Sequence, residues 1–304
     1  MSRLITIGTR GSHLALRQAD EVRQRLAGVE PLWSFTLKTI RTRGDKDGET
    51  PIRSLGRAAF TSALARALTE GEIDLAVHSL KDVPTSRPEG LSLAVVTPRA
   101  DPRDALVSRT GAALVDLPAG AVVGTGSARR AAFLLAIRGD LIVRSIRGNV
   151  ETRLAKVKRG PFDAGIFALA GLARLGMAGR ASEVFDPERM TPAPGQGALA
   201  VECRSDDAET ASLLARARER EADLAVTAER AVLRGLGGGC QAPIGVLAQV
   251  ERGKSLRVIA AVAAPDGSRV VRVRVEGPAD ADVAAARVIE ALRQQGAGDL
   301  LRRV

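Results

Sequence analysis

The chain has 304 residues, of which 45% are apolar, and its formal net charge is +10 at pH 7. This length and apolar content predict a globular protein of two or three domains and exclude a disordered chain. Two cysteines, Cys203 and Cys240, are too few for a secreted disulfide scaffold. No apolar run approaches the about 20 residues of a membrane span, and the amino terminus lacks signal-peptide features. We therefore expect a cytoplasmic protein that makes no membrane contact.

Arginine supplies most of the positive charge, and three explanations are open for it. A GC-rich genome accumulates arginine codons without any functional selection. A polyanionic ligand is the functional explanation, because guanidinium groups bind carboxylate or phosphate through two parallel hydrogen bonds. Nucleic acid is the third, and it is weakened by 2% aromatic residues and the absence of tyrosine.

The first two thirds of the chain alternate between predicted strands and helices. Apolar periodicity predicts strands at 4–8, 33–40, 73–77, 91–96, 122–124, 141–146, 162–168 and 198–203, and helices at 12–27, 58–70, 128–138, 149–159 and 169–175. This alternation is typical of an α/β protein with mostly parallel sheets covered by helices.

The last third changes character. Two helices are expected at about 206–219 and 221–235, followed by strands at 244–250, 256–263 and 269–276 and a helix at 280–294. Pro265-Asp266-Gly267 supplies a hairpin turn between the last two strands. We expect a small antiparallel sheet with a covering helix, forming a separate α+β domain.

Three strand-to-helix junctions combine hydroxyl or amide side chains with arginines. They are Arg10-Gly-Ser12, Thr125-Gly-Ser127-Ala-Arg129-Arg130, and Arg147-Gly-Asn149 with Arg153 nearby. Free helix N–H groups and arginines favour anions, and the carboxyl ends of strands are where doubly wound sheets bind ligands. The alternative is that each hydroxyl or amide only caps its helix and each arginine is a solvated surface group.

The segment His78-Ser-Leu-Lys-Asp-Val-Pro84 leaves a predicted buried strand through a turn. Asp82 there can orient a substrate N–H or stabilise a developing cation, and the alternative is a surface pair with Lys81. His78 is interpreted as structural. With two histidines in the chain and no Cys/His cluster, no metal site is expected.

Gly237-Gly-Gly-Cys240-Gln-Ala-Pro243 places the second cysteine on a glycine-rich turn. Consecutive glycines indicate unusual backbone angles or a close approach to a bulky group, so this thiol is open to a ligand. A buried cysteine beside an ordinary turn is the alternative. Cys203, by contrast, lies in the apolar run 198–203 and is expected to be an inert core thiol.

Taken together, these motifs resemble those of the porphobilinogen deaminase (hydroxymethylbilane synthase) family, over nearly the whole chain. The matching landmarks, in chain order, are Ile7–Arg10, Thr42–Asp45, Val77–Pro84, Asp101–Asp104, Gly124–Arg130, Arg147–Asn149, Ala170–Leu172, Pro194–Gly197 and Gly238–Gln241. The resemblance implies two domains like those of type II periplasmic binding proteins, with mixed, mostly parallel sheets, plus a small carboxyl-terminal α+β domain. The implied boundaries are 1–97 with 198–216 for the first domain, 98–197 for the second and 217–304 for the third.

The resemblance also implies the chemistry. A dipyrromethane cofactor is held through a thioether to Cys240, four porphobilinogen units are added head to tail with loss of ammonia, and hydrolysis frees hydroxymethylbilane. Asp82 is implied as the catalytic residue that bonds pyrrole N–H groups and stabilises the cation left when ammonia departs. The implied ligand residues are Ser79, Lys81, Asp82, Thr125, Ser127, Arg129, Arg130, Arg147 and Gly171 for the cofactor, and Arg10, Ser12, Arg153, Arg174 and Gln196 for the substrate.

One segment departs from the family pattern. Where the family has a glycine-rich flexible lid, residues 51–60 are one residue shorter and poor in glycine, with Arg57 in place of a lysine and Phe60 retained. Such proteins are usually monomers, and we expect the same here. A non-enzymatic binder of organic anions on the same fold is the main rival function, because fold does not fix function.

Overall fold

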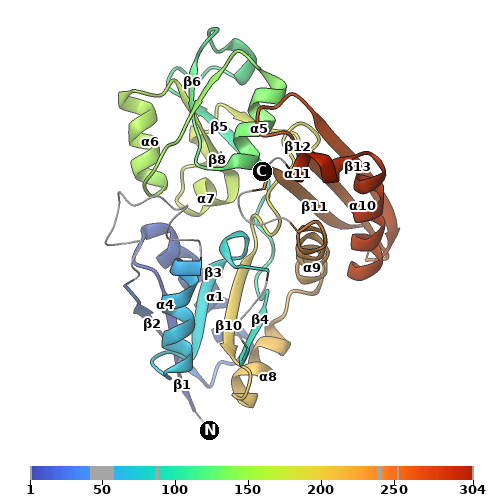
Figure 1. Cartoon of the computed structure of the whole chain (residues 1–304). Helices are drawn as coiled ribbons and strands as arrows, with labels where there is room; N and C mark the ends of the chain where they lie inside the picture. The colour runs from blue at the N-terminus through green and yellow to red at the C-terminus, as the bar shows by residue number, and fades with distance from the viewer. Residues whose placement is uncertain (1, 42–57, 86–88, 238–241, 252, 303–304) are drawn as a thin grey trace. The chain divides into compact units, whose positions relative to one another are not determined.

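The computed structural model describes residues 2–41, 58–85, 89–237, 242–251 and 253–302 (Figure 1). The chain divides into two compact units, each built from two separate stretches. The first unit comprises Met1–Arg99 with Ala198–Asp223, and the second comprises Ala100–Gly197 with Leu224–Val304. The division into three domains stays a prediction, because the second unit contains both the predicted second domain and most of the predicted third.

The first unit is built on a five-stranded sheet, sheet A, with the order β2-β1-β3-β10-β4. β1 pairs in parallel with β2 and β3, whereas β10 pairs antiparallel with β3 and β4. Within this sheet β10 therefore runs against the other strands. The elements of the unit are β1 (Leu4–Thr9), α1 (His13–Val29), β2 (Ser34–Thr39), α4 (Ala58–Thr69), β3 (Leu75–Ser79), the 3-10 helix η1 (Leu80–Asp82), β4 (Leu91–Ala94), β10 (Leu199–Arg204) and α8 (Ala208–Ala217).

Helices cover both faces of sheet A because successive strand residues point to opposite sides. Leu75 and Val77 of β3 pack with α1 and α8, whereas Ala76 between them packs with α4. Residues on the strands of a sheet covered on both faces have to be apolar throughout, which explains the short unbroken apolar run of β3.

The second unit contains a sheet of the same kind, sheet B, with the order β7-β6-β8-β5-β9. Here β5 is the strand that runs against its neighbours, because it pairs antiparallel with both β8 and β9. The elements around this sheet are β5 (Asp104–Ser108), η2 (Leu114–Asp116), β6 (Val122–Gly124), α5 (Ala128–Ile137), β7 (Ile142–Arg144), α6 (Val150–Arg159), β8 (Ala164–Ala168), α7 (Leu169–Arg174), η3 (Ala178–Arg180) and β9 (Glu183–Val184).

The rest of the second unit is an antiparallel sheet, sheet C, with the order β11-β12-β13. Its middle strand is buried on both sides. Val258, Ala260 and Val262 pack with the helices of the carboxyl-terminal region, whereas Ala261 and Ala263 pack into the core shared by α5 and sheet B. The elements are β11 (Ile244–Glu251), β12 (Ser255–Ala263), β13 (Val270–Pro278), α10 (Ala281–Gln294) and α11 (Ala297–Leu301), and α9 (Arg220–Gly235) leads into them.

The hairpin between β12 and β13 also packs on α5. Gly267 has φ +74°, and a β-carbon at this position would lie 2.5 Å from the backbone nitrogen of Ala136 and 2.6 Å from the carbonyl carbon of Leu135. Both the backbone angle and the close approach require glycine. The predicted turn at 265–267 thus also joins sheet C to the second α/β region.

The fold class expected from the sequence is confirmed at the level of its sheets: two mixed sheets in which most strands share one direction, and a small antiparallel sheet with helices packed on it. The strand predicted at 73–77 lies instead at Leu75–Ser79. Gly71, at φ +73°, ends α4, and the N–H of Ile73 still bonds to the carbonyl of Ala67 in that turn. The strands β5 and β9 and the short helix α11 were not predicted.

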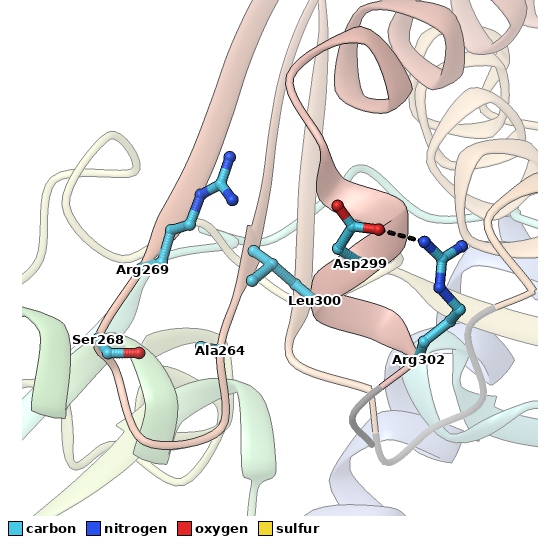
Figure 2. A pocket seen from close by; sticks show the side chains of 6 residues that line it. All are labelled: Ala264, Ser268, Arg269, Asp299, Leu300 and Arg302. Atoms are coloured by element: carbon cyan, nitrogen blue, oxygen red, sulfur yellow. Dashed lines mark hydrogen bonds and ion pairs between the residues drawn. The ribbon is translucent and has the colours of Figure 1, made fainter.

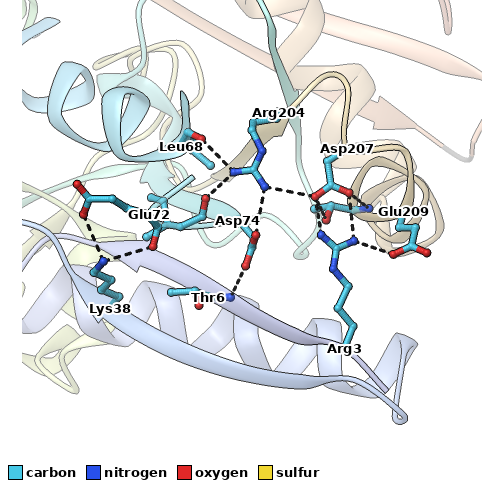
Figure 3. Close-up of polar contacts among 11 residues, drawn as sticks. Arg3, Thr6, Lys38, Leu68, Glu72, Asp74, Arg204, Asp207 and Glu209 are labelled. Carbon is cyan, nitrogen blue, oxygen red and sulfur yellow. Dashed lines mark hydrogen bonds and ion pairs between the residues drawn. The ribbon is translucent and has the colours of Figure 1, made fainter. Parts of the chain in front are cut away.

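An ion-pair network lies along the edge of sheet A at which its parallel strands begin (Figure 3). Arg3 precedes β1 and pairs with Asp207 at 2.7 Å, and Arg204 at the end of β10 pairs with Asp74 at 3.2 Å. Hydrogen bonds from Arg3 hold the pKa of Asp207 well below its usual range. The charged side chains at this edge pair with one another, so their role is to stabilise the fold.

Candidate active site at the carboxyl edges of the two mixed sheets

In the first unit, predicted site residues follow β1 and β3, whose carboxyl ends share one edge of sheet A. Ser12 caps α1, and its hydroxyl accepts a hydrogen bond from the N–H of Ala15 at 3.3 Å. Arg10 lies half-buried between the end of β1 and this cap. The capping alternative for Ser12 is therefore observed, and a ligand role for Arg10 stays a prediction.

The segment that follows β3 lies at the same edge of sheet A. Ser79 is its last strand residue, and Lys81 and Asp82 lie on the 3-10 turn η1, as the sequence predicted. Lys81 is half-buried, whereas the Asp82 carboxylate is exposed. A short rigid turn at the end of a buried strand fixes the position of Asp82 while leaving its side chain accessible.

Sequence reasoning missed two buried partners of this segment. Gln18 of α1 is 6% exposed, donates to the Ser79 hydroxyl at 2.9 Å and accepts from it at 3.3 Å. Glu202 of β10 is also buried, and its Oε2 lies 2.9 Å from Nε2 of His78. The burial of His78 agrees with the structural role expected for it. No short-range sequence signal could have paired these residues, because the antiparallel placement of β10 and the packing of α1 bring them together.

In the second unit, the loop after β6 leads into α5. The hydroxyl of Ser127 caps α5 by accepting from the N–H of Arg130 at 3.4 Å, and the buried Thr125 accepts from the N–H of Ser127 at 3.2 Å. Asn149 caps α6 in the same way at 2.8 Å. All three junctions singled out in the sequence are thus capped helix starts at carboxyl strand ends.

Arg129 and Arg130 are almost fully buried, at 4% and 7% exposed, and both contact Asp104. Burial alone would raise the pKa of Asp104, but the charges of the two guanidinium groups outweigh it and hold that pKa well below its usual range. The sequence motifs included Asp104 only as the last residue of the landmark Asp101–Asp104, and did not identify it as a site residue.

The remaining predicted residues of this unit lie near the same edge. Gln196 is fully buried and donates to Asp104, and Gly171 and Arg174 lie on α7, which follows β8 directly. Arg174 donates to the carbonyl of Gly197 at 3.2 Å. The side chain of Arg153 donates to the carbonyl of Gly148 at 2.7 Å.

Gly197 also marks the place where the two ends of the stretch Ala100–Gly197 meet. The N–H of Ala100 bonds to the carbonyl of Gly197 at 3.3 Å, and Gly197 has φ +91°. A β-carbon on it would lie 2.2 Å from the carbonyl oxygen of Ala100. Only glycine fits here, which explains the last glycine of the Pro194–Gly197 landmark.

Two predicted features fall wholly or partly outside the described residues. Cys240 and most of the predicted lid at 51–60 lie there, and Phe60 is described only as a backbone position in α4. The described residues nearest to Cys240 are Gly237, which follows α9 with φ +65°, and Ala242, two residues before β11 begins at Ile244. Cys203 is fully buried in β10, and burial raises the pKa of its thiol to about 11, as expected of an inert core thiol.

A pocket of about 440 Å³ lies elsewhere, in the carboxyl-terminal region (Figure 2). Asp299 and Arg302 on its wall pair with each other, and none of the predicted site residues lines it. Across the described residues, no cluster of three or more His, Cys, Asp or Glu side chains is arranged to hold a metal ion. Nor does any described helix have the length and apolar character needed to cross a membrane.

Comparison with known proteins decides the family. A family profile described as "Porphobilinogen deaminase, dipyromethane cofactor binding domain" matches residues 5–212, and its companion for the C-terminal domain matches residues 224–294. The chain belongs to the porphobilinogen deaminase family. This assignment confirms the resemblance drawn from the motifs, and with it membership of an enzyme family whose amino-terminal domain binds a dipyrromethane cofactor.

Curated porphobilinogen deaminases from three bacteria are similar to this chain over nearly its full length. That of Cutibacterium acnes is 49% identical, covering 97% of this chain and 96% of the relative. That of Desulforudis audaxviator is 47% identical and covers 100% and 99%, and that of Thermus thermophilus is 44% identical and covers 99% of each.

Among solved structures, the methionine binding protein MetQ is similar with a TM-score of 0.45 and 13% identity, covering 70% of this chain and 89% of that one. A probable amino-acid transporter binding protein from Bacillus subtilis has a TM-score of 0.45 and 14% identity, covering 71% and 90%.

Proposed function

We propose that this porphobilinogen deaminase family member condenses four porphobilinogen molecules head to tail, with loss of one ammonia at each addition, and releases hydroxymethylbilane by hydrolysis. The observation that carries this proposal is the placement of Asp82. Its carboxylate is exposed on a one-turn helix at the carboxyl end of β3, a position both fixed and open to a substrate. The reaction is inferred from the family assignment, and the negative charge of Asp82 is proposed to stabilise its cationic intermediates.

Asp82 acts on the substrate where positive charge develops. When ammonia leaves, the pyrrole that remains is a cation, and after bond formation a ring proton must be removed. A fixed carboxylate stabilises the cation, and its oxygens accept hydrogen bonds from pyrrole N–H groups. Because such stabilisation is stronger in the transition state than in the bound substrate, it accelerates the reaction and does more than tighten binding.

The residues of the second unit fit the chemistry of a dipyrromethane. Each pyrrole of the cofactor carries an acetate and a propionate, and Arg129 and Arg130 place two buried guanidinium groups at the carboxyl edge of sheet B. Guanidinium groups removed from water bind carboxylates strongly. We propose that these two arginines, with Ser79, Lys81, Thr125, Ser127, Arg147 and Gly171, hold the cofactor, and that Arg10, Ser12, Arg153, Arg174 and Gln196 bind substrate carboxylates.

When bound, the cofactor supplies a reactive pyrrole end to which the first substrate is joined. Cys240 would hold it through a thioether, and the other cysteine is unsuited to this because it is buried in β10. We further propose that the protein works as a cytoplasmic monomer and that the glycine-poor segment 51–60, with Phe60, covers the site.

An intact mass spectrum of the purified protein tests the proposal. We expect a mass excess of two linked pyrrole units in the wild-type chain and in a Cys203→Ala control, and an unmodified Cys240→Ser variant without activity. The same spectrum distinguishes the rival function. A wild-type protein that carries no pyrrole and does not consume porphobilinogen is a binder of organic anions, and the proposal is then wrong.

A further inference from the structure

Asp104 links three of the residues that we propose as carboxylate ligands. Its Oδ2 lies 2.7 Å from Nη1 of Arg129, and its Oδ1 lies 2.7 Å from Nη2 and 3.0 Å from Nε of Arg130. The amide nitrogen of Gln196 donates to the same Oδ1 at 2.8 Å. One buried carboxylate therefore contacts every one of these side chains.

The reversed direction of β5 brings Asp104 to this place. Asp104 is the first residue of β5 and pairs with Ala168, the last residue of β8. An amino-terminal residue of the reversed strand thus lies at the carboxyl edge of its neighbours, where α5 begins. Without that reversal, the first residue of β5 would lie at the opposite edge of sheet B.

Asp104 brings the side chains of Arg129 and Arg130 together. Neighbouring residues on an α-helix point about 100° apart, so adjacent arginines do not by themselves face one ligand. The two oxygens of Asp104 draw both guanidinium groups to one point and offset their mutual repulsion. Further contacts fix their orientation, since Arg129 donates to the carbonyl of Thr191 at 2.6 Å and Arg130 to that of Ile166 at 3.0 Å.

The fold itself does not require a carboxylate at this position. In sheet A the reversed strand is β10, whose first residue, Leu199, pairs with Ser79 at the corresponding edge. Leu199 is fully buried and apolar. A buried ion cluster adds little stability compared with apolar packing of the same volume, so its value lies in the geometry that it specifies.

We propose that Asp104 is a positioning residue for carboxylate recognition. It holds Arg129, Arg130 and Gln196 in one arrangement and so sets how tightly the enzyme binds cofactor and the growing pyrrole chain, without touching either. This inference rests on the proposed function, because it assigns the three side chains to that ligand.

The test compares Asp104→Asn with Asp163→Asn, purified as full-length holoenzymes. Asp163 also belongs to the second unit, pairs with Arg109 and accepts from the N–H of Val122 at 2.8 Å, but it contacts none of the three ligand residues. Both variants should lower the melting temperature. Only Asp104→Asn should raise the KM for porphobilinogen, by about tenfold, and lower the fraction of chains carrying cofactor by mass.

A double-mutant cycle makes the test specific. If Asp104 acts through the arginines, the loss of porphobilinogen binding in Asp104→Asn combined with Arg130→Gln should be smaller than the sum of the two single losses. Fully additive effects on KM, or unchanged KM and cofactor content in folded Asp104→Asn, would overturn the inference. Should Asp104→Asn not fold, Asp104→Glu keeps the charge but displaces it, and a wild-type KM in that variant also overturns it. A wild-type protein without pyrrole or turnover instead refutes the proposed function.

Discussion

The carboxyl edges of sheets A and B are built alike but filled differently. In each sheet a parallel strand leads into a capped helix start at the edge where the one reversed strand begins. The edge of sheet A exposes a single catalytic candidate, Asp82, whereas sheet B buries Arg129 and Arg130 around Asp104. An exposed carboxylate can meet a transient cation. A buried cationic pair suits a ligand that stays bound. If the proposed function holds, the edge of sheet A acts on the reaction and the edge of sheet B retains the growing pyrrole chain.

The largest effect is expected from Arg130→Leu, which should cost about 3 kcal/mol of unfolding free energy because it leaves Asp104 buried with a lost partner. Chemical denaturation of the purified variant measures this loss. Arg109→Leu, which breaks the exposed pair with Asp163, is the matched control and should cost less than about 1 kcal/mol. Equal losses in both variants would show that the edge of sheet B is an ordinary surface.

Asp82→Asn should behave in the opposite way, with nearly unchanged stability and a loss of at least about 2 kcal/mol of barrier stabilisation, roughly thirtyfold in kcat. The carboxylate is exposed, so the fold does not depend on it, whereas the proposed mechanism uses its charge at every addition. Steady-state turnover of porphobilinogen measures the effect, with the exposed Glu72→Gln as control. A variant within a few-fold of wild type would reduce Asp82 to a structural turn residue.

A smaller effect is expected at the support of Ser79. Gln18→Leu removes both hydrogen bonds to the Ser79 hydroxyl and should cost about 1 kcal/mol of stability. Gln24→Leu on the same helix, where the exposed side chain bonds only to Asp20 in the contacts observed, provides the control. Urea unfolding of both proteins distinguishes a buried support from an exposed one, and equal midpoints would contradict the difference.

The smallest effect concerns pH. The pKa of Asp104 is lower in the folded than in the unfolded protein, so its contribution to stability is fully present above the unfolded pKa of about 4 and is lost as the pH falls further. The melting temperatures of wild type and Asp104→Asn should therefore differ by a constant amount from pH 8 to pH 5 and converge below about pH 4. A difference that already shrinks between pH 7 and pH 5 would contradict a buried, ionised Asp104.

Features of the fold and the candidate site that depend on interactions between residues close in the chain could be predicted from the sequence, whereas those that depend on distant residues could not. The capping alternative for Ser12, Ser127 and Asn149 could be read from the sequence because a cap and its helix are neighbours in the chain. Strand β5 was missed because Asp104–Ser108 is a five-residue segment after Pro102 without a clear alternation. Its reversed direction leaves no periodic signal, and the partners of Asp104 lie 26 and 92 residues away. The proposed ligand residues were accessible from motifs, but Asp104, which contacts three of them, was not.

Strand β12 makes the carboxyl-terminal region and the second α/β region a single folding unit. Because Ala261 and Ala263 face the core of α5 and sheet B, a fragment of residues 224–304 would expose an alanine-lined face to water. Such a fragment should need its other half to become soluble and ordered, as in fragment complementation. Strand β11 is thereby joined through β12 to the helix that carries Arg129 and Arg130.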